Sequence, residues 1–375
     1  MKEFITSSNK LYHCPDLPLA EGGEAYVFEI VEDSNLVAKV YKSGRRTAEH
    51  ESKLSVMVSN RPIMSEQFAW PLDLIYENDQ FIGYVMCKIK YNERLRDNYV
   101  YDKRQGKPWS LYITLAKNVA AAVHNVHEIH QVIGDLNPDN ILVNPNDGMV
   151  ALVDTDSYHI SDSRRTYRCE VGMPEYVAPE LQGIHFPSAS LPTFTEETDR
   201  FSLAVIIFQL LMNGAHPFAC KIINGSSSEF SPYYNIQKGY CAFFKETCAD
   251  NMEIPTYSPT INCLPDDIQK LFRRAFVSGR TNTSLRPSAE EWYYALECLE
   301  NELVECPNNP QHLYYSNTKC PWCNVDKKMK EKSEMINKGR GIFQKPLGKN
   351  NSESNPDNCN PDAISDDFMG ITMSF

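Results

Sequence analysis

The alternation of apolar and polar residues predicts paired strands in the N-terminal part of the chain. Residues 19–28 show a strand–turn–strand pattern around two glycines, and residues 36–41, with the sequence Leu-Val-Ala-Lys-Val-Tyr, form a further strand. Residues 70–76 and 80–89 alternate like two strands that a short polar turn joins.

Helical periodicity dominates the middle of the chain. Residues 46–59 have helical spacing, and apolar residues recur at the helical period from Ser110 to His130. Residues 201–212 are apolar almost all round, which predicts a buried helix. Residues 219–262 have weak periodicity, and their role cannot be read from the sequence.

Polar residues with a fixed spacing lie between two of these helices. Asp135 and Asn140 are five residues apart in a loop that contains Pro138 and so cannot be a regular helix. Two short apolar runs on either side of the turn 144–148 then bring Asp154 back beside them. Asp and Asn are common in ordinary turns, but this spacing favours a shared site. Carboxylate and amide oxygens are hard ligands that suit Mg²⁺ and a triphosphate.

Composition restricts the class of protein. The chain has 375 residues, 42% of them hydrophobic, enough for two lobes and a small appendage. Its net charge of −12 argues against a general nucleic-acid or membrane-surface binder. Residues 1–10 show no secretory signal, and the longest apolar run, 201–212, is too short to span a bilayer. Most of the 12 cysteines are scattered, so we expect a reduced, cytoplasmic protein.

Four residues near the C-terminus have the spacing of a metal site. Cys320 and Cys323 form a C-x-x-C knuckle, and Cys306 and His312 precede it closely. A Cys₃His set fits a closed tetrahedral Zn²⁺ site, which is structural because no coordination position is left open. A redox C-x-x-C motif would need a thioredoxin-like context, which is absent. Beyond these residues, 327–349 is basic and 350–367 acidic, which predicts a disordered tail. A nucleic-acid or partner-docking role for the basic block stays open.

The loop around Asp135 resembles the catalytic loop of protein kinases, H-R-D-L-x-x-x-N, and Asp154-Thr155-Asp156 resembles the D-F-G motif. The sequence Gly-Asp-Leu-Asn-Pro at 134–138 is similar to a bacterial branch of the Hanks-type serine/threonine kinases, whose members often carry a C-terminal zinc ribbon. The resemblance covers residues 17–323.

This resemblance implies an α+β bilobal fold. We expect a kinase N-lobe at 1–89, with an antiparallel sheet and one helix, and a mostly helical C-lobe at 90–300. A zinc-ribbon-like module at 301–326 and a tail at 327–375 would follow.

The resemblance also implies an ATP site. The glycine loop would cover the phosphates, Lys39 would reach the α- and β-phosphates, and a helix glutamate would pair with Lys39. We expect this glutamate to be Glu51, with Glu49 as the alternative. The implied nucleotide-binding residues are Leu19, Gly22, Gly23, Val27, Ala38, Lys39, Glu51, Met86, Cys87, Lys88, Asn140 and Asp154.

Scaffold contacts follow from the same resemblance. Residues 172–180 resemble the substrate loop and the A-P-E motif, and Arg286 would pair with Glu180. Asp199 would hold the backbone of the catalytic loop.

The implied activity is ATP- and Mg²⁺-dependent phosphorylation of protein serine or threonine. Asp135 would accept or orient the hydroxyl proton, Asn140 and Asp154 would hold Mg²⁺, and the catalytic residues would be Asp135, Lys39 and Asn137. Asn137 replaces the usual lysine, and Asp156 replaces the glycine that would follow Thr155.

Gly134 replaces the arginine of the catalytic loop, so a phosphorylated activation loop would lack its usual partner. We therefore predict that phosphorylation of Ser161, Ser163 or Thr166 is not the activating switch.

Two alternatives stay open. A pseudokinase would bind nucleotide or a partner without transfer, and Asn137 and the altered glycine loop favour this reading. A small-molecule kinase of the same fold is disfavoured by Glu180 and Arg286, which shape a peptide-binding lobe in the family. By resemblance, partners would be a metal-dependent protein phosphatase and a von Willebrand A-type protein.

Overall fold

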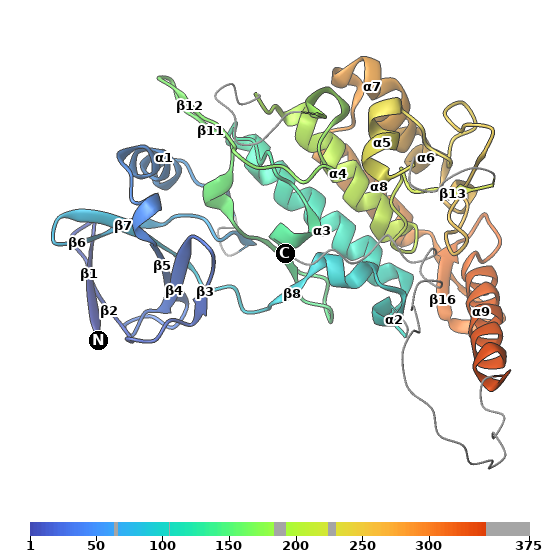
Figure 1. The fold of residues 1–375 in the computed structure, drawn as a ribbon, viewed down its shortest axis with the longest axis horizontal. Helices are drawn as coiled ribbons and strands as arrows, with labels where there is room; N and C mark the ends of the chain where they lie inside the picture. The colour runs from blue at the N-terminus through green and yellow to red at the C-terminus, as the bar shows by residue number, and fades with distance from the viewer. Residues whose placement is uncertain (64–66, 105, 184–192, 224–229, 343–375) are drawn as a thin grey trace, which may run out of the picture. The chain divides into compact units, whose positions relative to one another are not determined.

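The structure is a computed structural model that describes residues 1–63, 67–104, 106–183, 193–223 and 230–342. A first compact unit spans Met1–Cys323, and a second begins at Asn324. The first unit has a sheet with one helix in its N-terminal part and packed helices in its C-terminal part, which confirms the expected bilobal α+β fold (Figure 1). No helix among the described residues is long and apolar enough to cross a membrane.

The N-terminal sheet has seven antiparallel strands in the order β2-β1-β6-β7-β5-β4-β3. Helix α1 packs against β6 and β7, and it begins after Thr47, whose hydroxyl accepts a hydrogen bond from the His50 amide. The strand and helix bounds are β1 Lys2–Thr6, β2 Leu11–Cys14, β3 Ala20–Glu21, β4 Ala25–Glu29, β5 Leu36–Tyr41, α1 Ala48–Ser59, β6 Asp73–Glu77 and β7 Gln80–Cys87.

The first two strands extend the sheet further than the sequence pattern suggested. Phe4, Tyr12 and Cys14 are buried in one cluster with Phe28 and Ile82. Burial of these side chains explains why the short segment at the N-terminus is ordered as strands.

A second, three-stranded sheet carries the loop with Asp135. Strands β8 (Glu93–Arg94), β9 (Ile141–Val143) and β10 (Val150–Leu152) lie in the order β10-β9-β8. Gly148 closes the β9–β10 turn at φ 75°, a left-handed conformation that glycine adopts without strain. The predicted hairpin is therefore confirmed, and it returns the chain to the loop with Asp135 and Asn140.

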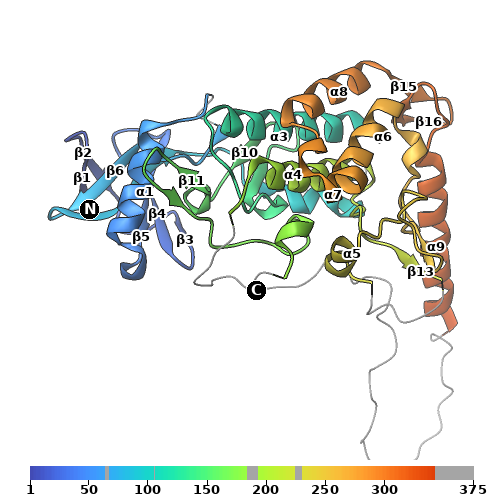
Figure 2. The ribbon, with the colours of Figure 1, turned by 90° about the horizontal axis from the view of Figure 1, so that it is seen from above.

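Helices α3, α4 and α8 form the centre of the C-terminal part, and α3 packs against both others (Figure 2). Helix α4 is buried along nearly its whole length, as its apolar sequence predicts, and a capping box of Thr195 and Thr198 starts it. The remaining bounds are α2 Tyr101–Arg104, α3 Trp109–Glu128, β11 Ile160–Ser161, β12 Thr166–Tyr167, α4 Glu196–Leu211, β13 Lys221–Ile222, α5 Pro232–Lys238, β14 Met252–Glu253, α6 Asp266–Arg273, α7 Gly279–Thr281 and α8 Ala289–Asn301.

Asp199 of α4 holds the backbone of the loop that leads to Asp135. Its carboxylate accepts hydrogen bonds from the amides of Ile133 and Gly134, at 2.7 and 2.9 Å, and from His127 at 3.0 Å. Its carboxylate is fully buried, so these donors compensate its lost hydration. The structure thus gives Asp199 the expected scaffold role and makes His127 a structural histidine.

The C-terminal end of the first unit is a hairpin of β15 (Leu303–Cys306) and β16 (Asn309–Tyr315). Helix α9 follows and spans Trp322–Ile342. Residues 327–342 of the predicted tail therefore lie in this helix. Lysine and glutamate have high helix propensity, and pairs such as Lys327 and Glu331 are four residues apart, which supports a helix. Residues 343–375 of the predicted tail lie outside the described residues.

Candidate functional site

A cavity of about 960 Å³ lies where the glycine loop and strands β5 and β7 face the β9–β10 hairpin. Leu142 of β9 and Val153, which follows β10, line the cavity from this hairpin. Gly22 and Gly23 of the glycine loop line the cavity, and a Cβ added to Gly23 would meet no atom within 4 Å. Most of the predicted nucleotide-binding residues line this cavity: Leu19, Gly22, Gly23, Val27, Lys39, Met86, Cys87, Lys88 and Asp154.

The prediction for Ala38 is wrong. Neighbouring residues of a strand point to opposite faces, so Lys39 shares its face with Val37 and not with Ala38. Val37 lines the cavity, whereas Ala38 is buried in the apolar cluster on the other face of the sheet. Val37 is thus a site residue that the sequence analysis missed, although the period of two could have identified it.

The prediction that Lys39 pairs with Glu51 is also wrong. The Lys39 ammonium lies 2.6 Å from Oδ1 of Asp156 and 3.4 Å from Oδ1 of Asp154. Burial lowers the pKa of Lys39, but the charge of Asp156 outweighs it, so the net pKa is raised and the lysine is charged. Glu51 instead accepts a hydrogen bond from the Tyr76 hydroxyl at 2.9 Å. The alternative, Glu49, pairs with Arg165.

Asp156 lies at the back of the cavity with its side chain only 9% exposed. The hydroxyls of Tyr41 and Tyr84 donate to its carboxylate at 2.5 and 3.1 Å. Burial opposes ionisation, but Lys39, the Tyr41 hydroxyl and the charge of Lys53 lower the pKa of Asp156 to about 2. The sequence showed that an acid replaces glycine here, but its partners lie more than 70 residues away and gave no local signal.

Asp154 is held in the left-handed conformation, at φ 56° and ψ 35°, which is unfavourable for a residue with a side chain. The Ser157 hydroxyl and amide donate to its carbonyl at 2.7 and 3.1 Å and so fix this turn. Burial and the charge of Asp156 raise the pKa of Asp154, while Lys39 opposes this rise. An added cation would relieve the repulsion between the two acids.

Asp135 and Asn140 lie together beside Asp154. The Asn140 amide nitrogen is 3.4 Å from Oδ2 of Asp135, and the backbone carbonyl of Asn140 accepts from the amide of Val153 at 2.9 Å. Oδ1 of Asp135 accepts from the Met173 amide at 3.0 Å. Burial raises the pKa of Asp135, and the charge of Asp154 raises it further, which makes Asp135 a stronger proton acceptor.

The Asn137 side chain contacts Asp135, which keeps it next to the expected proton acceptor. Its side chain is buried; Oδ1 accepts from the Asp139 amide at 2.9 Å, and Nδ2 donates to the Asp135 carbonyl at 3.2 Å. The Oδ1 contact caps the short helical turn Pro138–Asn140, and the Nδ2 contact ties Asn137 to the backbone of Asp135.

The donor set fits the chemistry of a metal–nucleotide complex. Asp154 and Asn140 offer hard oxygen ligands, which Mg²⁺ prefers. Lys39 supplies a fixed positive charge, and the glycine loop leaves room for phosphates. The structure therefore brings together the amine, the amide and the two acids that the sequence placed far apart.

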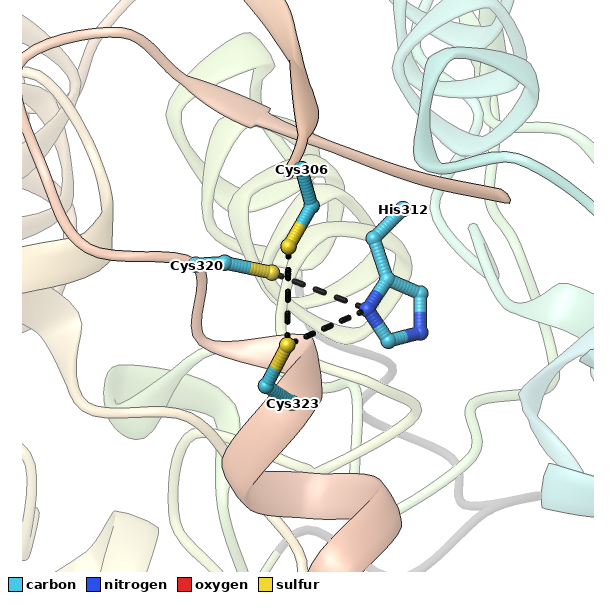
Figure 3. Close-up of side chains that lie close together, drawn as sticks. All are labelled: Cys306, His312, Cys320 and Cys323. Atoms are coloured by element: carbon cyan, nitrogen blue, oxygen red, sulfur yellow. Dashed lines mark hydrogen bonds between the residues drawn. The ribbon is translucent and has the colours of Figure 1, made fainter. Parts of the chain in front are cut away.

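A separate cluster at the C-terminal end of the first unit unites Cys306, His312, Cys320 and Cys323, whose side chains point toward one another (Figure 3). Their ligand atoms all lie within 4.8 Å of one another. Sγ of Cys306 is 3.5 Å from Sγ of Cys323, and Nδ1 of His312 is 3.7 Å from the sulfurs of Cys320 and Cys323. Ligands around a tetrahedral zinc ion are about 3.6–3.8 Å apart, so the cluster has the required size.

The other ring nitrogen of His312 is also engaged. Nε2 lies 3.0 Å from Nδ2 of Asn309, and Nδ1 is on the side of the ring that faces the sulfurs of Cys320 and Cys323. Trp322, inside the C-x-x-C knuckle, stacks edge-on against Trp109 of α3 at 5.3 Å. The hairpin is thereby attached to the helix that precedes the catalytic loop.

Comparison with known proteins gives one family. The protein kinase domain family matches residues 21–293. The protein kinase YegI of Escherichia coli K12 is 30% identical over 322 residues, which cover 82% of this chain and 48% of that protein. The cAMP-dependent protein kinase catalytic subunit 2 of Drosophila melanogaster is 29% identical over 52% of this chain and 49% of its own length. A shorter match, to the serine/threonine-protein kinase MRCK beta of Homo sapiens, is 30% identical over 26% of this chain and 6% of that protein. The chain spans about half the length of the YegI relatives that it matches.

Proposed function

The chain belongs to the protein kinase family, and from this premise we propose that it is an ATP- and Mg²⁺-dependent protein kinase that phosphorylates serine or threonine. The observation that carries the proposal is the ion pair of Lys39 and Asp154, 3.4 Å apart in the lining of the cavity. Asp135 and Asn140 are 3.4 Å from each other, and the backbone of Asn140 is bonded to Val153, the residue before Asp154. The name of the human relative supports serine and threonine as acceptors.

Each residue has a role that its surroundings support. Asn140 and Asp154 would hold Mg²⁺, which supplies charge neutralisation at the phosphates. Lys39 would bind and orient the phosphates, since it is charged and held within the cavity. The Asp135 carboxylate would accept the hydrogen bond of the acceptor hydroxyl and take up its proton.

An alternative function is a pseudokinase that binds nucleotide without transfer. Asn137 favours it, because its buried amide offers no positive charge near the γ-phosphate, where such a charge stabilises the transition state. Transfer to a protein, and not binding of nucleotide alone, therefore decides between the two functions.

The deciding experiment is mapping of phosphorylated residues by mass spectrometry after incubation with Mg²⁺-ATP and a generic protein substrate. The proposal predicts phosphoserine or phosphothreonine with the wild-type protein and a loss of about a hundredfold or more in Asp135→Asn. Asp267→Asn, at an exposed acid of α6, should keep the wild-type rate. Equal phosphorylation by wild type and Asp135→Asn would contradict the proposal.

We further propose that Cys306, His312, Cys320 and Cys323 bind one structural Zn²⁺ ion. The distances between their ligand atoms and the three soft sulfur donors support this metal. Elemental analysis should give one zinc ion per chain, and Cys320→Ser should lose it. Zinc retained in full by Cys320→Ser would contradict the site.

A further inference from the structure

The acid that pairs with Lys39 comes from the segment after β10 and not from helix α1. In protein kinases the corresponding lysine pairs with a glutamate of this helix, and the pair must be formed for catalysis. Here Lys39 is 2.6 Å from Asp156. The two acids of α1 have other partners: Glu49 is paired with Arg165, and Glu51 is hydrogen-bonded to Tyr76.

Helix α1 instead contributes a cation to the same place. Lys53 is buried, and its ammonium donates to the backbone carbonyl of Asp156 at 2.6 Å. A buried ammonium is costly unless it is paired and hydrogen-bonded. Lys53 therefore depends on Asp156, and the helix presents a positive group where the family arrangement needs a negative one.

The two tyrosines of the sheet fix the Asp156 carboxylate. Tyr41 follows Lys39 by two residues on β5, and Tyr84 is opposite Lys39 on β7. Both hydroxyls donate to the carboxylate, at 2.5 and 3.1 Å. Because strand residues two apart share a face, the lysine and both tyrosines converge on one buried acid.

We propose that Asp156 is the positioning residue of Lys39, in place of the helix glutamate, and that Lys53 ties helix α1 to the same residue. This inference rests on the proposed kinase function. Asp154 and Asp156 lie at the start and middle of one short helical turn. One segment therefore positions both the acid proposed to bind the metal, Asp154, and the lysine proposed to bind the nucleotide, Lys39. Asp156 is the nearer acid to Lys39, at 2.6 Å against 3.4 Å for Asp154.

The inference is tested by the affinity for Mg²⁺-ATP and by kcat and KM for ATP, measured on the same variants. Asp156→Asn should weaken nucleotide binding and lower kcat/KM by about tenfold or more, and Asp156→Glu should recover part of the loss. Glu51→Gln, on helix α1, should keep both the affinity for Mg²⁺-ATP and kcat/KM within about twofold of wild type. Thermal unfolding of each variant identifies any loss that comes from unfolding.

A double variant gives a second test that a purely structural role would not pass. Lys53→Glu combined with Asp156→Gly places an acid on the helix and a glycine after Thr155, as in the family arrangement. The double variant should be about fivefold or more better in kcat/KM than either single variant, because the two changes are coupled through Lys39.

Two results would overturn the inference: Asp156→Asn with wild-type affinity and kcat/KM, or Glu51→Gln as damaging as Asp156→Asn. Failure of the kinase proposal is distinguishable from both, since wild type would then transfer no phosphate. In that case the binding measurement still tests whether Asp156 positions Lys39. Lys39→Met and Asp156→Asn must weaken Mg²⁺-ATP binding by similar factors, and unequal factors would overturn the inference.

Discussion

Arg286 and Glu180, which are 106 residues apart, form a two-pronged ion pair with both N–O distances at 2.7 Å. The Arg286 side chain is completely buried and also donates to the carbonyls of Glu197 and Gly279. The predicted pair is therefore confirmed, and it joins the substrate loop to the start of α4 and to the chain before α8.

Loss of this pair should destabilise the C-terminal part of the first unit. Arg286→Ala leaves a carboxylate and two carbonyls without their donor, so we expect a loss of about 3 kcal/mol in the free energy of unfolding. Urea denaturation measures it. Arg165→Ala is the control, because its pair with Glu49 is exposed, and it should cost less than about 1 kcal/mol. Equal losses in the two variants would contradict the assignment.

Stability should fall at acid pH because His216 is buried in its neutral form. Nε2 of His216 lies 3.0 Å from the Glu175 carbonyl, and Nδ1 accepts from the Phe218 amide. Burial lowers the pKa of His216 from 6.5 to about 4, and the Glu175 carbonyl offsets this only in part. The unfolded chain therefore takes up a proton at a higher pH than the folded chain does. The stabilisation is complete above pH 6.5 and is lost as the pH falls toward 4.

Urea denaturation of wild type and His216→Gln tests this. From about pH 7.5 to about pH 5, wild type should lose about 2 kcal/mol more than the variant does. His124→Gln, at a partly exposed position of α3, should lose as much unfolding free energy between these two pH values as wild type does. Identical pH dependence of wild type and His216→Gln would refute the prediction.

Removal of zinc should loosen the C-terminal hairpin. The four ligands close a loop from β15 to the start of α9, and the Trp322 indole donates to the Leu313 carbonyl at 2.7 Å. We expect a strong chelator, or Cys320→Ser, to lower the melting temperature by about 5 °C or more. Cys298→Ser, at an exposed cysteine of α8, should change neither zinc content nor melting temperature. Unchanged melting after zinc removal would show that the site does not stabilise the fold.

Activation should not require phosphorylation of the segment after Asp156. Gly134 has φ 82°, and a Cβ there would lie 2.8 Å from Cβ of Cys169. No arginine fits at this position, so the usual partner of a phosphorylated loop is excluded by packing. The triple variant Ser161→Ala, Ser163→Ala, Thr166→Ala should keep kinase activity within about twofold of wild type. A severalfold change would contradict the prediction, provided that the variant melts at the wild-type temperature.

Regular elements were predicted well where one physical signal decided them. The period of two located β5, β6 and β7, and the helical period located α1 and α3, because each of these elements buries one face. Asp135, Asn140 and Asp154 could be brought together since a short hairpin separates them. The contact of Arg286 with Glu180 came from family resemblance, because no local pattern links residues so far apart.

The errors have physical causes too. Ala38 was assigned by motif, although its neighbour Val37 shares the face of Lys39. Glu51 shares a helix face with Leu54 and Val58, which favours it as the partner of Lys39, but its carboxylate is bound to Tyr76 instead. The acid beside Lys39 is Asp156, at a position where the family has an uncharged glycine, and only the packed structure reveals this.

The most direct test of the account is equilibrium binding of ATP with and without Mg²⁺, by calorimetry, for wild type, Lys39→Met and Asp154→Asn. We predict that Mg²⁺ strengthens the binding of ATP to wild type. Lys39→Met should weaken the binding of ATP by about tenfold or more, and Asp154→Asn should bind ATP equally with and without Mg²⁺. Lys270→Met, at an exposed lysine of α6, should bind as wild type does. Absence of Mg²⁺-ATP binding by wild type, or equal binding by all four proteins, would contradict it.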